Sequence, residues 1–215
     1  MNKLIRENRK ILIITSVAIL LPILFGVFFW NQLPDRMATH WGVSGEPDGY
    51  SSKAFAVFGL PLIVLGLHWI CVLGTAADPK KSNHSEKILK MVFWICPVVS
   101  LLCSILTYAY SLGIEVNVGF WVLLFMGIVF MIVGNYLPKC KQSYTIGIKL
   151  PWTLHDPENW NKTHCLGGFL WTVGGAVIAL TSPLANPWIV FPIIFVMVLV
   201  PTVYSWRYAV KKEKE

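Results

Sequence analysis

Residues 11–30 read ILIITSVAILLPILFGVFFW, twenty positions without a charged side chain. A helix rises about 1.5 Å per residue, so this run is long enough to cross a hydrocarbon core of about 30 Å. The composition of the whole chain agrees, because 55% of its 215 residues are hydrophobic and only 13% are charged, whereas soluble domains average about 25% charged residues. We therefore predict an integral membrane protein. The run has no small-residue cleavage site, which favours a retained span over a signal peptide.

Five further runs have the same character, at about 54–76, 88–112, 118–137, 166–182 and 187–208. The fifth is short, but Asp156 is a good helix N-cap and Pro157 suits the first helical position, so its helix is expected to begin near 157. Lipid offers no partner to free backbone N–H and C=O groups, so each span should be helical. The predicted fold class is an all-α integral membrane protein with six transmembrane helices.

The Lys and Arg residues predict an orientation. Sixteen of the 18 fall in the two terminal segments and in alternate loops: Lys3, Arg6, Arg9, Lys10, Lys80, Lys81, Lys87, Lys90, Lys139, Lys141, Lys149, Lys162, Arg207, Lys211, Lys212 and Lys214. The remaining loops hold only Arg36 and Lys53. By the positive-inside rule both termini are cytoplasmic and residues 31–53 face outward. Because the charge sits beside apolar runs and no recognition fold is present, we predict no direct nucleic-acid partner.

The predicted outer loop, residues 31–53, contains the polar stretch THWGVSGEPDGYSSK at 39–53. Its three glycines permit positive φ angles, and the tetrapeptide Glu46-Pro47-Asp48-Gly49 is typical of a turn. We therefore expect a folded loop. The side chains of His40, Glu46 and Asp48 leave three interpretations open: local pairing with Arg36 and Lys53, recognition of an outside ligand, or a metal site.

The predicted inner loop, residues 138–165, is basic and carries Trp152 and Trp160, which suggests docking on the membrane face or on a partner. Its Cys and His residues leave a zinc site open, although their spacing matches no ordinary motif: Cys140, His155, His164 and Cys165. A catalytic Cys/His pair is no better supported, since nothing marks a third, orienting group. The chain has no HExxH, P-loop or GxSxG motif. We predict no catalytic residue, no enzyme and no cofactor.

His68 lies in the middle of the second span. An ionisable group there is either a functional site or a neutral histidine that is hydrogen-bonded to a neighbouring helix. The spans contain no Asp or Glu, which disfavours a proton-coupled transporter. In the fifth span, the pairs Gly167-Gly168 and Gly174-Gly175 share one helix face, and this predicts close packing within the chain or a dimer contact.

Both long loops resemble one family. The outer loop follows the pattern Pro, His, Gly-x-Pro-Asp, Lys, here Pro34, His40, Gly45, Pro47, Asp48 and Lys53. The inner segment is matched at Gly134, Asn135, Pro138, Lys139, Gly147, Ile148, Pro151, Trp152, Thr153, Leu154, Trp160, Thr163 and His164. The chain thus resembles the SdpI family, bacterial membrane immunity proteins that protect a producer cell against its own secreted peptide toxin. It departs from the family at Trp41-Gly42, where Phe-Asn is usual, and at Lys149, where Arg is common and would form a bidentate fork.

The resemblance implies a non-enzymatic immunity and signal-transduction protein of the bacterial cytoplasmic membrane. It implies an N-terminal module, residues 1–87, and a C-terminal module, residues 88–215. The implied toxin contacts are His40, Glu46, Asp48 and Lys53, and the implied docking residues of the inner loop are Lys149, Trp152, Trp160 and His164. Implied partners are a secreted peptide toxin, the lipid bilayer and, for some members, a cytoplasmic ArsR-type autorepressor. The rival classes are a small-molecule or ion transporter or a metal-dependent membrane enzyme, which would use His68 or the inner Cys and His residues, and a structural subunit of a membrane complex.

Overall fold

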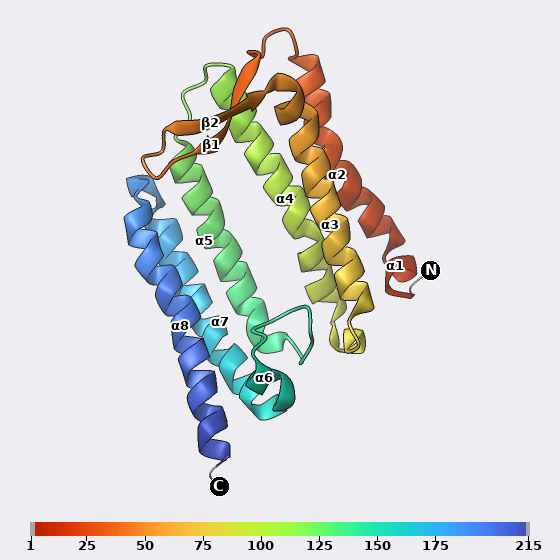
Figure 1. Ribbon diagram of the computed structural model, residues 1–215, viewed down its shortest axis with the longest axis vertical. Coiled ribbons are helices and arrows are strands. Elements are labelled where there is room, and N and C mark those ends of the chain that lie inside the picture. The colour runs from red at the N-terminus through yellow and green to blue at the C-terminus, as the bar shows by residue number, and fades with distance from the viewer. Residues whose placement is uncertain (1–2, 214–215) are drawn as a thin grey trace. The chain divides into compact units, whose positions relative to one another are not determined.

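A computed structural model describes residues 3–213 of the chain; Lys214, the last member of the C-terminal basic cluster, lies outside this range. Within this range the structure contains eight α-helices and one β-hairpin, which are labelled in Figure 1. The helices are α1 Lys3–Glu7, α2 Arg9–Phe28, α3 Leu60–Ala77, α4 Glu86–Ser111, α5 Val118–Tyr136, α6 Pro151–His155, α7 Pro157–Thr181 and α8 Pro187–Lys212. The strands are β1 Arg36–Trp41 and β2 Pro47–Ser52, and a π-helical turn at Phe55–Gly59 leads into α3.

Within residues 3–213, six helical segments are long and apolar enough to cross a membrane: Arg9–Phe28, Phe55–Ala77, Glu86–Ser111, Val118–Lys139, Pro157–Leu184 and Pro187–Lys212. The six predicted spans are therefore confirmed, and the protein is a multi-pass helical membrane protein. The helix that contains the fifth span begins at Pro157 as predicted, and the Asp156 side chain caps it by accepting a hydrogen bond of 2.9 Å from the Glu158 amide. The orientation derived from Lys and Arg stays a prediction.

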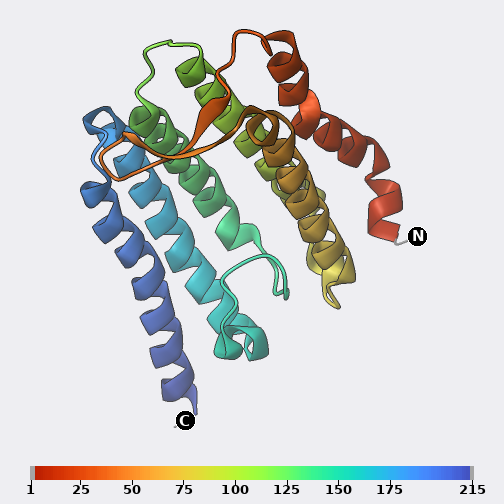
Figure 2. The same cartoon turned by 45° about the horizontal axis from the view of Figure 1, so that its top comes forward.

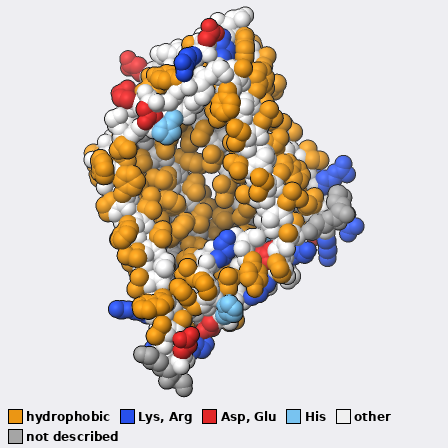
Figure 3. All heavy atoms as spheres, viewed as in Figure 1, with side chains coloured by type: hydrophobic (Ala, Val, Ile, Leu, Met, Phe, Trp, Pro, Cys, Tyr) orange, Lys and Arg blue, Asp and Glu red, His pale blue; other side chains and the backbone are white. Residues whose placement is uncertain are grey.

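The surfaces of the helices are suited to lipid. Leu180 is 80% exposed and Phe28 is 79% exposed, although both are large and apolar. On the face that Figure 3 shows, hydrophobic side chains cover the lengths of the helices, while charged side chains gather near the helix ends. This distribution is the one that a bilayer selects, because its core solvates apolar groups and excludes charge.

The chain divides into two compact units, residues 1–77 with 86–118 and residues 78–85 with 119–215. The predicted modules 1–87 and 88–215 rest on the family pattern and stay a prediction. The structural units differ from those modules at α4, which packs on α2 and α3, and at the short segment 78–85, which belongs to the second unit.

In the first unit, polar bonds tie α4 to α2. Ser100 Oγ donates to the Ile19 carbonyl at 3.1 Å, and Tyr108 Oη donates to the Pro22 carbonyl at 3.0 Å. A buried cluster then joins the hairpin to these helices, and its members are Leu33, Met37, Ala56, Val57 and Tyr108. Met37 of β1 is fully buried, so the hairpin is anchored at its base by apolar packing.

In the second unit, glycines let α5 approach α7 closely. A Cβ on Gly127 would lie 2.6 Å from the Gly175 carbonyl oxygen, and a Cβ on Gly168 would lie 2.8 Å from the Gly134 carbonyl oxygen. The predicted packing of the span-five glycines within the chain is thereby confirmed. Helices α7 and α8 lie side by side (Figures 1 and 2) and are joined by Asn159, whose Nδ2 donates to the Ser205 carbonyl at 2.9 Å.

The hairpin adds a detail that the sequence pattern does not predict. Sequence patterning indicates helices with a folded loop, whereas β1 and β2 form a two-stranded antiparallel sheet inside that loop. The loop does fold, as expected from its glycines and its turn tetrapeptide. Strand pairing is not predicted because the loop lacks the strict alternation of apolar and polar residues that marks a strand.

Candidate functional site

The hairpin loop, residues 31–53, is shaped by a tight turn and a bulge. The Gly42 amide donates to the Glu46 carbonyl at 2.9 Å, and Gly45 turns the chain with φ +83°. Opposite pairs run from Arg36 with Ser52 to Trp41 with Pro47, and the register slips on both sides of His40. A bulge bends a strand and redirects a side chain. Here the bulge lies at His40.

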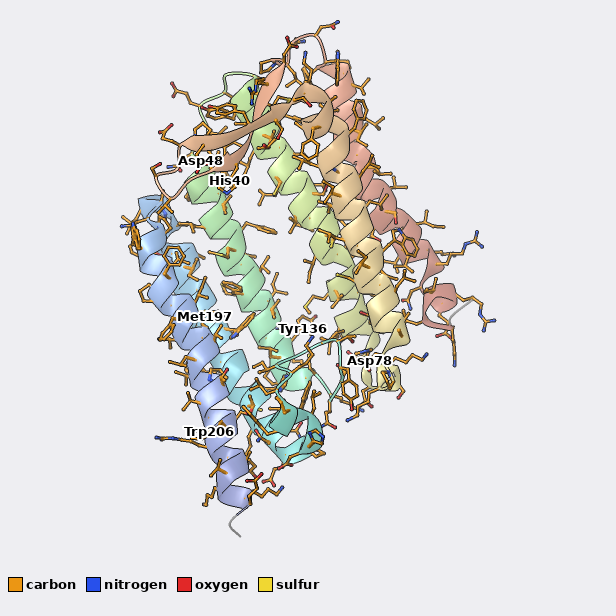
Figure 4. All side chains as sticks on the ribbon, in the orientation of Figure 1. His40, Asp48, Asp78, Tyr136, Met197 and Trp206 are labelled. Atoms are coloured by element: carbon orange, nitrogen blue, oxygen red, sulfur yellow. The ribbon has the colours of Figure 1, made fainter. Side chains whose placement is uncertain are left out.

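The bulge brings together two of the predicted toxin-contact residues. His40 Nδ1 lies 2.5 Å from Asp48 Oδ1, and Figure 4 shows the two side chains near each other on the hairpin. Both stay open to solvent, with 73% of the His40 side chain and 54% of the Asp48 side chain exposed. A Cβ on Gly49 would lie 2.9 Å from His40 Cβ, and one on Gly42 would lie 2.8 Å from Asp48 Oδ2. The glycines therefore make room for this exposed pair.

The other two predicted contacts lie elsewhere on the loop. Lys53 closes its base: Nζ donates to the Trp30 carbonyl at 3.1 Å, lies 3.3 Å from Asp35 Oδ1 and stands over the Trp30 ring. Only 14% of the Lys53 side chain is exposed, so its position favours a role in holding the loop closed. Glu46 is exposed in the turn. Within residues 3–213, His40 thus pairs with Asp48 and Lys53 pairs with Asp35, whereas neither Glu46 nor Asp48 forms an ion pair with Arg36 or Lys53.

The basic loop, residues 138–165, is built around a stacked pair. The rings of Trp160 and His164 lie 4.0 Å apart at 22°, and each residue is 1% exposed. His164 Nδ1 lies 2.7 Å from the Trp160 carbonyl oxygen, and the Ile148 amide donates to Nε2 at 2.9 Å. These bonds assign the proton to Nδ1, which makes His164 a neutral imidazole that both donates and accepts. Gly147 passes over the pair with φ +120°, and a Cβ there would lie 2.5 Å from His164 Nε2.

This burial revises the predicted docking set. Trp160 and His164 are each 1% exposed, so their side chains pack inside the loop and are not accessible at its surface. Lys149 is exposed and donates from Nζ to the Thr145 carbonyl at 3.1 Å. Trp152, on α6, is half-buried. A docking surface on this loop would therefore use Lys149 and Trp152.

Sequence reasoning missed Asp78, which directly follows α3 and is 2% exposed. Its Oδ2 accepts from the amides of Tyr144 and Thr145 at 3.0 Å each and from Thr145 Oγ1 at 2.7 Å. Its Oδ1 accepts from the Lys80 amide at 2.7 Å. The available signal was an acid at the end of an apolar helix in the turn sequence Asp78-Pro79, but its partners on the basic loop lie 66 and 67 positions away.

His84 completes this cluster, with Nε2 3.4 Å from Asp78 Oδ2 and 3.3 Å from Thr145 Oγ1. Burial disfavours the charged form of Asp78, but the hydrogen bonds from Thr145, Lys80 and Tyr144 outweigh it and hold the pKa of this carboxyl below its usual value. Burial lowers the pKa of His84, although Asp78 opposes the shift. At neutral pH the cluster therefore contains a carboxylate and a neutral imidazole.

The zinc interpretation of the basic loop finds no support in the geometry. Among residues 3–213, no three His, Cys, Asp or Glu side chains form a group that could hold a metal ion. Both ring nitrogens of His164 are engaged within the loop. Burial also raises the pKa of the Cys140 thiol to about 11, so this thiol stays protonated and is a poor ligand or nucleophile at neutral pH.

His68 joins two helices of the first unit. It is 1% exposed, and its Nε2 lies 3.2 Å from Thr15 Oγ1, which in turn donates to the Leu12 carbonyl at 3.1 Å. With the hydroxyl proton directed to Leu12, the threonine oxygen accepts from His68 Nε2. This geometry favours a neutral histidine bonded to a neighbouring helix over a functional site in the span.

Together these features define a multi-pass helical membrane protein with one exposed β-hairpin and one compact basic loop. Comparison with known proteins matches residues 17–65 to a domain of unknown function (DUF1648) and residues 139–205 to the SdpI/YfhL protein family. The chain is 26% identical over 193 residues to the Immunity protein SdpI of Bacillus subtilis (strain 168), which covers 90% of this chain and 91% of that protein. These matches agree with the resemblance of the chain to the SdpI family. No solved structure matches it.

Proposed function

We propose that the protein is a membrane immunity protein that protects a bacterium against a secreted antimicrobial peptide. The observation that carries this proposal is the similarity to the Immunity protein SdpI along 90% of the chain. Because the similarity covers both long loops, it supports a shared mode of action and not only a shared set of apolar helices.

In this proposal the hairpin loop faces outward in the cytoplasmic membrane, as the Lys and Arg distribution predicts. It meets the toxin through the exposed His40–Asp48 pair. The pair is suited to recognition, since it is exposed and its carboxylate and imidazole present both an acceptor and a donor. Apolar packing of Met37 fixes the base of the hairpin, so less freedom is lost when a ligand binds.

The basic loop would face the cytoplasm and dock a partner through Lys149 and Trp152. An ArsR-type autorepressor held at the membrane is the partner that the family resemblance suggests. A lysine and a half-buried tryptophan are suited to an acidic protein surface with an apolar anchor. The rival transporter and metal-enzyme classes are less well supported, because His68 is bonded to Thr15 and no metal-binding group exists among the described residues.

Expression in a toxin-sensitive bacterium tests the proposal. Wild-type protein should raise survival against at least one secreted peptide toxin. His40→Ala and Asp48→Ala should lower survival at equal membrane abundance, and Arg36→Ala, on the same strand as His40 but outside the pair, serves as the control. Unchanged killing across a broad panel of such toxins would contradict the immunity proposal. Full protection by both variants would exclude the pair from the mechanism.

A further inference from the structure

We propose that Asp78 is a positioning residue for the docking surface of the basic loop, and that the whole segment 78–85 belongs to this functional region. The inference rests on the proposed docking function and goes beyond it. It assigns a role to a connection between helices that carried no predicted site residue.

The first connection runs from Asp78 to Lys149. Asp78 Oδ2 receives three hydrogen bonds from Tyr144 and Thr145, two of which come from Thr145 itself. The carbonyl of Thr145 accepts from Lys149 Nζ at 3.1 Å. Thr145 is thus held on one side by Asp78 and holds Lys149 on the other. Hydrogen bonds to an ionised carboxylate are about twice as strong as neutral ones. The bonds between Asp78 and Thr145 are therefore stronger than the bond between Thr145 and Lys149.

The second connection runs from the same segment to α6, the helix that carries Trp152. Gln142 Nε2 donates to the carbonyls of Thr153 and Leu154 at 2.8 Å each. Gln142 is held in turn by segment 78–85, because Lys80 Nζ donates to its Oε1 at 2.5 Å and Asn83 Nδ2 donates to its backbone carbonyl at 2.7 Å. One segment therefore sets the position of both docking residues, Lys149 and Trp152.

This network is buried at its centre and exposed at its ends. Asp78 is 2% exposed, whereas Lys149 is an exposed side chain and Tyr144 is 49% exposed. A buried carboxylate that lost its donors would be unfavourable, so the loop is confined to the shape that satisfies Asp78. In Figure 4 Asp78 lies at the end of α3, which places this constraint outside the apolar span.

Amide hydrogen exchange of the purified full-length protein in lipid nanodiscs tests the positioning. Asp78→Ala should speed exchange at Tyr144 and Thr145 by about tenfold, since their amides lose a charged acceptor. Acetylation of Lys149 by sulfosuccinimidyl acetate should rise about threefold. Thr145→Val should give smaller increases, while Thr145→Ser, which keeps the hydroxyl, should match wild type. Asp156→Asn is the control, because it alters a carboxyl of the same unit outside this network.

Docking is then measured as membrane retention of a fluorescent ArsR-type repressor. Because Asp78 acts through Lys149, the double variant Asp78→Ala/Lys149→Ala should lose no more retention than the stronger single variant. Unchanged exchange and acetylation in Asp78→Ala would overturn the positioning role. If Asp78→Ala fails to accumulate, Thr145→Val weakens the first connection by removing one of its three hydrogen bonds, and Gln142→Ala removes the side-chain bonds of the second. Unchanged exchange in both variants would then overturn the positioning role equally. Faster exchange in Asp78→Ala with unaltered repressor retention would show that Asp78 orders the loop without affecting docking. No retention of the repressor by the wild-type protein would contradict the docking function itself.

Discussion

The hairpin loop and the basic loop are both polar segments between membrane spans, yet they are held in opposite ways. In the hairpin loop the characteristic histidine, His40, is exposed and pairs with an exposed acid. In the basic loop the characteristic histidine, His164, is buried, stacked on Trp160 and bonded through both nitrogens. The same residue type is therefore suited to recognition in one loop and to internal support in the other. A resemblance to a family motif cannot by itself separate these roles.

The largest expected effect comes from the two positive-φ glycines of these loops. Gly147→Ala combines an unfavourable φ of +120° with a Cβ 2.5 Å from His164 Nε2, and should lower the free energy of unfolding by about 3 kcal/mol. Gly45→Ala has a similarly unfavourable φ but meets nothing within 4 Å, so about 1 kcal/mol is expected. Thermal unfolding of the purified proteins in detergent compares the two. Equal losses in the free energy of unfolding for the two variants would show that the close contact between Gly147 and His164 does not contribute to stability.

The next largest effect on stability is expected from replacing the two histidines, His164 and His40. His164→Ala removes the partner of the half-buried Ile148 amide and of the Trp160 carbonyl, and should cost about 2 kcal/mol. His40→Ala removes an exposed side chain and should change stability by less than about 0.5 kcal/mol. The same thermal unfolding measurement applies, with membrane abundance as a second readout. A greater loss of stability for His40→Ala would reverse the roles assigned to the two loops.

A smaller effect is expected from acid on the basic loop. The pKa of His84 is lowered in the folded protein, so the unfolded chain binds a proton more readily and stability falls as the pH drops below the unfolded value of 6.5. The pKa of Asp78 is also lowered, and its contribution stays complete until the pH approaches 3.8. Amide exchange of residues 78–85, corrected for intrinsic rates, should therefore be faster at about pH 5.5 than at about pH 7.5. This difference should vanish in His84→Gln.

At Gly49 the expected effect on stability is small. A Cβ there would lie 2.9 Å from His40 Cβ, so Gly49→Ala should displace His40 while changing stability by less than about 1 kcal/mol. Survival against toxin should fall nevertheless, because the His40–Asp48 pair is disturbed. Normal survival would show that the geometry of the pair is unimportant for protection.

The sequence predicts the features of this molecule that depend on interactions between residues close together in the chain. Each span could be found because an apolar run of about 20 residues is sufficient to identify it, and the start of α7 because Asp156 and Pro157 lie side by side there. Trp160 and His164 are four residues apart on a helix, a spacing that places side chains on one face. That spacing indicates contact but not burial, and for this reason the sequence alone assigns the pair to a docking surface.

Contacts between distant positions could not be predicted. Asp78 meets Tyr144 and Thr145 only because the fold brings segment 78–85 to the basic loop. The hairpin register depends on a bulge at His40 that no alternating pattern reveals. In both cases the contacting residues are polar, and the path of the backbone determines which of them meet. Neither the composition nor the periodicity of the sequence records that path.

The central claim is that the hairpin loop meets the toxin while the basic loop does not. Its most direct test places the photo-crosslinking residue p-benzoylphenylalanine at Val43, an exposed hairpin position, and separately at Tyr144 of the basic loop. Cells are then irradiated with a toxin against which wild-type protein protects. A covalent adduct with the toxin is expected at position 43 and none at position 144. Adducts at 144 alone, or none at 43 in cells that remain protected, would contradict it.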